Sequence, residues 1–211
     1  MNRVVITGIG IISCLGNDKN EVLTSLLESK SGLTLNPEYK ENGMRCHISG
    51  QVNPNLDVID RKMLRFMSET SAYAFLSTEE ALADAGLSFE DINNDKTGVI
   101  VGSGTGSSRE LKNVVDTARE KGIKRIGPYA VTRTMGNTTS AAISTFFQTK
   151  GVSFSIASAC STSLHCISYA FDLIKSGRQQ TVIAGGSEDD HWTGAMTVSY
   201  THLRAHETLP Y

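Results

Sequence analysis

Three short apolar runs of one design set the strongest limit on what this chain can fold into. The runs are Val4–Ile6, Val99–Val101 and Val182–Ala184, and each is rich in β-branched residues and soon followed by glycine. Because every position of such a run is apolar, each suits a strand that is covered on both faces, as in a parallel sheet. Amphipathic segments fill the intervals, and this alternation predicts an α/β fold with right-handed crossovers.

The amphipathic segments predict four helices by their 3.6-residue periodicity. Gly86 follows the second helix at a position suited to a C-cap. The stretch 31–63 differs, because it holds scattered polar residues and prolines with only a weak alternation. We therefore expect that stretch to leave the main sheet. In chain order, the predicted helices cover about residues 19–28, 68–85, 142–147 and 160–177.

The composition of the 211-residue chain excludes several classes of protein. Its 20 basic and 22 acidic residues nearly balance, so nothing global indicates a nucleic-acid partner. No apolar run approaches the ~20 residues that cross a bilayer, and the start, MNRVVITGIG, lacks the pattern of a signal peptide. We expect a cytoplasmic protein with no membrane contact.

Four cysteines at irregular spacing fit neither a metal site nor a disulfide framework. We expect reduced thiols, with Cys14, Cys46 and Cys166 in packing roles. Cys160 differs because it stands in SIASACSTSLHC, where an apolar strand-like run meets the start of a helix. The unpaired amides and positive dipole of a helix N-terminus stabilise a thiolate and can hold an oxyanion. Position alone leaves two alternatives for Cys160: a nucleophile or a buried structural cysteine.

Seven motifs occur in order between residue 1 and about residue 197: VVITGIGIIS, GMRCHISGQV, DRKMLRFMSETSAYAFLSTEEALADAGL, GVIVGSGTGS, IGPYAVTRTM, SIASACSTSLHCI and VIAGGSEDD. In this combination the chain resembles the β-ketoacyl-acyl-carrier-protein synthases, specifically the synthase I type. The resemblance implies the N-terminal half of a thiolase-like α/β fold, a mixed sheet with helices packed on both faces. The parent protein would be a homodimer, and residues 1–197 would form its truncated N-terminal domain.

The resemblance also implies a reaction, the condensation of malonyl and acyl groups in fatty acid elongation. Cys160 would take the acyl group from an acyl carrier protein as a thioester, and a malonyl-loaded carrier would then lose carbon dioxide and attack it. The family uses two histidines and a lysine from its second half, which this chain does not contain. We therefore expect the fragment to be inactive alone, and we expect no cofactor and no metal.

Five further residues match functional positions of the family. Met135 matches a position that lines the acyl-chain pocket near the dimer interface. Basic side chains can attract an acidic carrier protein electrostatically, although any one of them could be an ordinary solvated surface charge. The positions that match carrier-docking residues are Lys62, Arg65, Lys121 and Lys124.

Two alternative functions remain open beside synthase I. The parent could be a type II or polyketide ketosynthase, because the cysteine chemistry is shared. It could instead be a non-catalytic partner subunit resembling a chain-length factor, although such subunits have lost the nucleophile.

Several motifs suggest other chemistry and are set aside. Gly8 and Gly10 lack the third glycine of a dinucleotide site, and GVIVGSGTGS lacks the GK[ST] of a P-loop. His165 lies five residues after Cys160 and is expected to turn away from it into packing. His202 and His206, with Glu207, have metal-ligand spacing. They fall in residues 198–211, which resemble a translated sequencing adapter and are expected to be a non-native tail.

Overall fold

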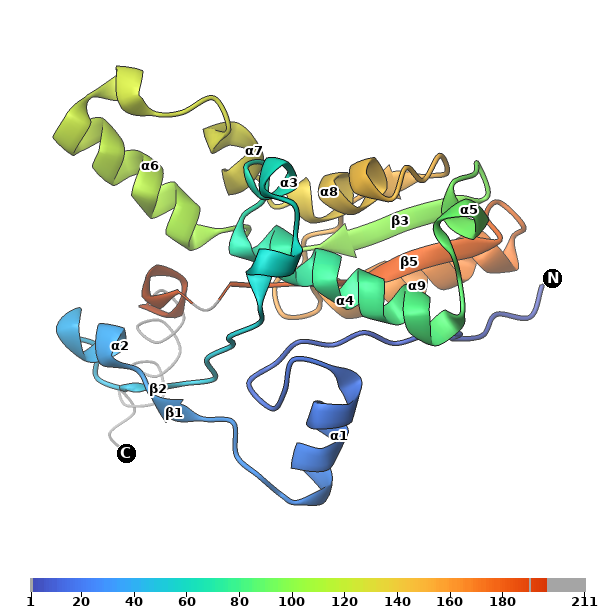
Figure 1. The fold of residues 1–211 in the computed structure, drawn as a ribbon, viewed down its shortest axis with the longest axis horizontal. Coiled ribbons are helices and arrows are strands. Elements are labelled where there is room, and N and C mark those ends of the chain that lie inside the picture. The colour runs from blue at the N-terminus through green and yellow to red at the C-terminus, as the bar shows by residue number, and fades with distance from the viewer. Residues whose placement is uncertain (1, 190, 197–211) are drawn as a thin grey trace, which may run out of the picture.

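The centre of the molecule is a three-stranded parallel sheet in the order β4-β3-β5 (Figure 1). The computed structural model describes residues 2–189 and 191–196. β3 (Thr97–Gly102) lies between β4 (Ser153–Phe154) and β5 (Thr181–Gly186). The second and third apolar runs are therefore strands, as predicted.

Helices cover both faces of this sheet. Val99 and Val101 pack with Ala74 of α4 (Glu69–Ala85) and Ile143 of α8 (Thr138–Phe146). Ile100, which points the other way, packs against α9 (Thr162–Lys175). Successive side chains of a strand face opposite sides, so a run of consecutive apolar residues serves two cores at once. The prediction of an α/β fold with helices on both faces is confirmed (Figure 1).

The first apolar run, Val4–Ile6, is not a strand among the described residues, so this prediction is wrong. Val5 and Ile6 are exposed at 58% and 79%. Just after the run, carboxylates of α4 accept hydrogen bonds from the main chain: the amide of Ile9 donates to Asp84 Oδ2 at 2.9 Å and that of Ile11 to Glu80 Oε2 at 2.8 Å. The backbone lies directly on α4, where a Cβ at Gly8 would stand 2.1 Å from the carbonyl oxygen of Ala81.

The four predicted helices all form. They are α1 (Lys19–Leu27), α4, α8 and α9, and Gly86 ends α4 in the left-handed conformation with φ of +66°. A fifth long helix, α6 (Ser108–Lys121), was not predicted, because its sequence is mostly polar and Glu110 is its one buried residue. The shorter helices are α2 (Pro37–Glu41), α3 (Arg61–Leu64), α5 (Phe89–Ile92), α7 (Ala130–Thr134), and the 3-10 turns η1 (Leu56–Val58) and η2 (Ile123–Arg125).

The stretch 31–63 leaves the main sheet, as predicted. It contains a separate antiparallel pair, β1 (Thr34–Leu35) with β2 (Ile48–Ser49). In Figure 1 this pair lies with α2 apart from the three-stranded sheet. Across the part of the chain that the structure describes, no helix is both long and apolar enough to span a membrane.

α9 is apolar on two faces, and only one of them packs on the sheet. The buried face consists of Thr162, Cys166, Ala170 and Leu173. The apolar face that predicted the helix is largely exposed instead, with Leu164 at 69% and Ile167 at 44% of their full exposure. A surface helix normally buries its apolar stripe, so this second face has no covering among the described residues.

Candidate active site

Cys160 lies in a tight turn that leads from β4 into α9. Ser158 and Ala159 accept hydrogen bonds from the amides of Ser161 and Thr162, both at 3.1 Å. The Thr162 hydroxyl, in a residue only 3% exposed, donates to the carbonyl oxygen of Ala159 at 2.7 Å and accepts from the amide of Ser158 at 2.9 Å. The turn is thus fixed from inside, while Cys160 itself is exposed.

The structure agrees with the expected placement of Cys160 and corrects one detail of its surroundings. The residue stands two positions before the first residue of α9, at the positive end of the helix dipole. The amides of Ser161 and Thr162, however, already bond within the turn. They are therefore not among the unpaired amides that were expected to hold an oxyanion.

The carboxyl ends of β3 and β5 press against this turn. A Cβ at Gly102 would lie 2.0 Å from the carbonyl oxygen of Ile156, and one at Gly186 would lie 2.5 Å from Ser163 Oγ. Glycine at both strand ends lets the backbone approach the turn closely. Parallel α/β sheets bind ligands at the carboxyl ends of their strands, and Cys160 lies at that edge.

The other cysteines and His165 fall in distinct environments. Cys166 is fully buried against Ile100, and burial raises the pKa of its thiol. Cys46 is exposed, so its predicted packing role is wrong. His165 is also exposed rather than packed in the core, and its Nδ1 lies 2.7 Å from Ser158 Oγ. Its ring therefore contacts the turn through Ser158.

The four predicted carrier-docking residues are all exposed. Lys62 lies in α3 and Arg65 follows it, while Lys121 ends α6 and Lys124 lies in η2. Within residues 2–189 and 191–196, none of the four forms an ion pair. Next to Arg65, the ring of Phe66 packs edge-on against that of Tyr129, with centroids 4.8 Å apart. This contact joins the α3 region to the segment that leads from η2 to α7.

Met135 follows α7 and is 44% exposed. Its neighbours contact the loop Ser103–Gly106, which we call the glycine loop, because a Cβ at Gly106 would lie 3.1 Å from the carbonyl oxygen of Thr134. The same loop contacts the Cys160 turn at Gly104, where a Cβ would lie 3.0 Å from Ala159 Cα. One loop therefore separates the segments that carry Met135 and Cys160.

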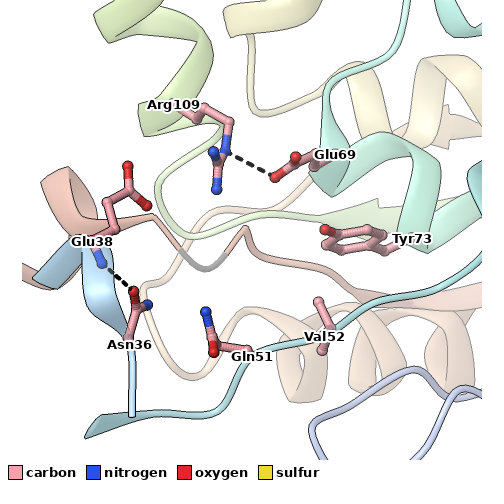
Figure 2. A pocket seen from close by; sticks show the side chains of 7 residues that line it. All are labelled: Asn36, Glu38, Gln51, Val52, Glu69, Tyr73 and Arg109. Carbon is pink, nitrogen blue, oxygen red and sulfur yellow. Dashed lines mark hydrogen bonds and ion pairs between the residues drawn. The ribbon is translucent and has the colours of Figure 1, made fainter. Parts of the chain in front are cut away.

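A polar cavity of about 120 Å³ lies elsewhere and includes no residue of the Cys160 turn (Figure 2). Arg109 and Glu69 line this cavity, with Arg109 Nε 3.0 Å from Glu69 Oε2. Burial raises the pKa of the Glu69 carboxyl by more than the pairing with Arg109 lowers it, so the pKa is raised. Nearby His191 is 4% exposed and lies 3.5 Å from Glu38, and burial lowers its pKa.

Among the described residues, no group of three or more His, Cys, Asp or Glu side chains could hold a metal ion. His202, His206 and Glu207 belong to the predicted tail, residues 198–211, which lies outside the described part of the chain.

Sequence reasoning missed Glu188, whose carboxylate accepts hydrogen bonds from three groups of the glycine loop. The signal was present, because an acidic pair begins two residues after the end of β5, whose carboxyl end lies near the candidate nucleophile. The second acid, Asp189, instead accepts from Ser107 and Ser108 at the start of α6.

Comparison with known proteins agrees with this arrangement. The chain is 50% identical over 211 residues to 3-oxoacyl-[acyl-carrier-protein] synthase 1 of Escherichia coli, covering 95% of this chain and 52% of the relative. It is 49% identical over 195 residues to the Haemophilus influenzae protein of that name, covering 91% of this chain and 48% of the relative. The chain thus spans about half the length of the curated relatives it matches.

Solved structures share the fold. A β-ketoacyl synthase from Burkholderia phymatum superposes with a TM-score of 0.82 at 29% identity, covering 95% of this chain and 50% of the other. The ishigamide ketosynthase/chain length factor, 21% identical, also gives 0.82, covering 92% and 49% of the two chains. The family model of the β-ketoacyl synthase N-terminal domain matches residues 1–205. The chain therefore belongs to the β-ketoacyl synthase family and has the N-terminal half of its thiolase-like fold.

Proposed function

We propose that this chain is the acyl-accepting half of a condensing enzyme that elongates fatty acids, with Cys160 as its nucleophile. The observation that carries the proposal is the exposed thiol at the start of α9, against the carboxyl ends of β3 and β5. A cysteine thiolate both attacks thioesters and leaves them well.

The proposed reaction has two steps. The Cys160 thiolate attacks the acyl carbonyl of an acyl carrier protein, and the carrier thiol leaves. A malonyl carrier then loses carbon dioxide, and the resulting carbanion attacks the acyl-cysteine, forming the new carbon–carbon bond and releasing the Cys160 thiolate. The proposed setting is a cytoplasmic homodimer, with Met135 lining the acyl pocket.

The carrier partner is part of the proposal. Lys62, Arg65, Lys121 and Lys124 are exposed cations on α3, α6 and η2, suited to an acidic carrier. A related type II polyketide ketosynthase has been solved in complex with its acyl-carrier protein. That structure is 20% identical to this chain and bears on the fold alone.

Synthase I is preferred over the alternatives for two reasons. Identity is 44–50% to the bacterial relatives named synthase 1, but 32% both to a synthase 2 of Coxiella burnetii and to the chloroplastic synthase I of Arabidopsis thaliana. The presence of Cys160 argues against a non-catalytic partner subunit. The acyl chain-length profile of a full-length protein separates synthase I from a type II or polyketide enzyme.

The chain itself tests the first step. We expect incubation with an acyl-loaded carrier to add one acyl mass to the peptide that contains Cys160, and Cys160→Ala to lose the addition. We expect no condensation with malonyl carrier, because the chain spans about half the length of its curated relatives and the family's two histidines and lysine are expected from the second half. Acylation of the Cys160→Ala variant at the wild-type rate would overturn the assignment, and condensation at a normal enzymatic rate would overturn the expected inactivity.

A further inference from the structure

The glycine loop, Ser103–Gly106, is the element that touches both sides of the candidate site. Gly104 lies against Ala159, and Gly106 lies against Thr134, one residue before Met135. Both contacts involve main-chain atoms, which cannot rotate away as a side chain can. A shift of this loop therefore moves or releases the turn that precedes Cys160.

Glu188 holds the loop by three hydrogen bonds. Its Oε2 accepts from Ser103 Oγ at 2.8 Å and from Thr105 Oγ1 at 3.0 Å, and its Oε1 accepts from the amide of Gly104. Hydrogen bonds to a carboxylate are shorter and stronger than those between neutral groups. Ser103 is only 2% exposed and also accepts from the amide of Gly106 at 2.8 Å. The anchor thus reaches from β5 across to the loop after β3.

The turn needs such support because Ala159 has φ of +51°. This left-handed conformation is costly for a residue with a Cβ, and it persists only where surrounding contacts enforce it. Gly104 presses its main chain against Ala159 from the loop side, and Thr162 holds the Ala159 carbonyl from the helix side. If the loop contact is lost, one of these two restraints on the Ala159 conformation is removed and the bonds to Thr162 must hold it.

We infer that Glu188 is a positioning residue: it holds the glycine loop against Ala159 and so keeps Cys160 at the N-terminus of α9. The functional meaning of this role rests on the proposed function of Cys160. The structural role of Glu188 does not depend on that function, because it concerns only the position of the Cys160 thiol.

The test is the rate of Cys160 alkylation by iodoacetamide at pH 7 in the 211-residue chain, followed by peptide mass spectrometry. Exposed Cys46, in the stretch outside the main sheet, is the reference in the same sample. We expect Glu188→Gln to slow Cys160 relative to Cys46 by about two- to fivefold, the factor that corresponds to losing a helix-end interaction. The matched control Asp189→Asn removes the same charge one residue away and is expected to leave the ratio unchanged.

The direction of the change in the Cys160 alkylation rate distinguishes a positioning role of Glu188 from a purely electrostatic effect of its charge. Removing a nearby negative charge favours a thiolate, so a charge effect alone would speed alkylation in Glu188→Gln. Faster or unchanged alkylation, or an equal slowing in Asp189→Asn, overturns the inference.

A milder variant covers the case in which Glu188→Gln fails to fold. Thr105→Val lies at an exposed position and removes one of the three hydrogen bonds to Glu188. We expect a smaller slowing of Cys160 in this variant, and an unchanged ratio there counts against the inference.

Acylation of Cys160 by an acyl-loaded carrier is measured in the same proteins. If wild-type Cys160 accepts no acyl group but Glu188→Gln still slows alkylation, the proposed function fails and the positioning role stands. If wild-type Cys160 is acylated and Glu188→Gln alters neither rate, the positioning role fails and the function stands.

Discussion

Single residues at the carboxyl edge of the sheet decide how closely the strands approach the Cys160 turn. Gly102 and Gly185 stand at neighbouring positions on β3 and β5 but differ in their surroundings. A Cβ at Gly102 would meet the main-chain oxygen of Ile156 at 2.0 Å, whereas a Cβ at Gly185 would have no heavy atom within 4 Å. The first position requires glycine for space, and the second does not.

We predict that Gly102→Ala lowers the free energy of unfolding by about 1–3 kcal/mol, the usual cost of forcing an atom into a packed interior. Gly185→Ala is the matched control and is expected to change it by less than about 1 kcal/mol, because fewer unfolded conformations offset any loss. Urea unfolding followed by circular dichroism measures both. Equal destabilisation in the two variants would contradict this reading of the strand ends.

At the scale of elements, periodicity predicted the helices that carry apolar side chains at helical spacing, whether or not this structure buries them. It found α4 and α8, which bury apolar side chains, and also α1 and α9, whose Leu26 and Leu164 are exposed. It missed α6, which is mostly polar.

The first run shows a different failure. An apolar β-branched run forms a strand only beside a neighbouring strand, and Val4–Ile6 pairs with none among the described residues; the chain that follows it bonds to carboxylates of α4.

The candidate site was likewise predicted only in part from the sequence. The placement of Cys160 before a helix followed from the strand–turn–helix pattern around it. The support of its turn by Glu188 did not, because Glu188 and Gly104 are 84 residues apart and meet only through parallel pairing of their strands. Local sequence patterns carry no information about such a contact.

The basic elements α3 and η2 give a prediction about the carrier. We expect Lys62→Glu combined with Lys124→Glu to weaken binding of an acidic acyl carrier by about tenfold at low salt, and by less at high salt, because exposed charges are screened. Lys30→Glu combined with Lys40→Glu, at exposed positions outside these elements, changes the net charge by the same amount and is the control. Surface plasmon resonance at two ionic strengths measures the effect. Equal weakening by the control pair would show that only total charge matters.

At the scale of the whole molecule, many large apolar side chains of the described residues remain exposed. Among them are side chains of the N-terminal segment, of α1 and of the outer face of α9. Contiguous exposed apolar surface normally marks an interaction site or promotes aggregation. Because the chain spans about half the length of its curated relatives, we expect it to associate with itself when it is produced alone.

We predict that Leu164→Lys with Phe171→Lys reduces this self-association and the binding of an apolar dye, since both residues lie on the exposed face of α9. Ile123→Lys, at an isolated position that is 78% exposed, is expected to have little effect. Sedimentation velocity across a concentration series gives the answer. A wild-type chain that stays monomeric at tens of micromolar would contradict the prediction.

The strand order also determines when the sheet can form during protein synthesis. Both neighbours of β3 come later in the chain, so Thr97 cannot pair with Thr181 until β5 has been synthesised. At about 5–20 residues per second on the ribosome, the 84 residues between Gly104 and Glu188 take roughly 4–17 s to appear. During that interval β3 has an unpaired edge, so we expect the nascent chain to depend on chaperones most strongly before β5 is made.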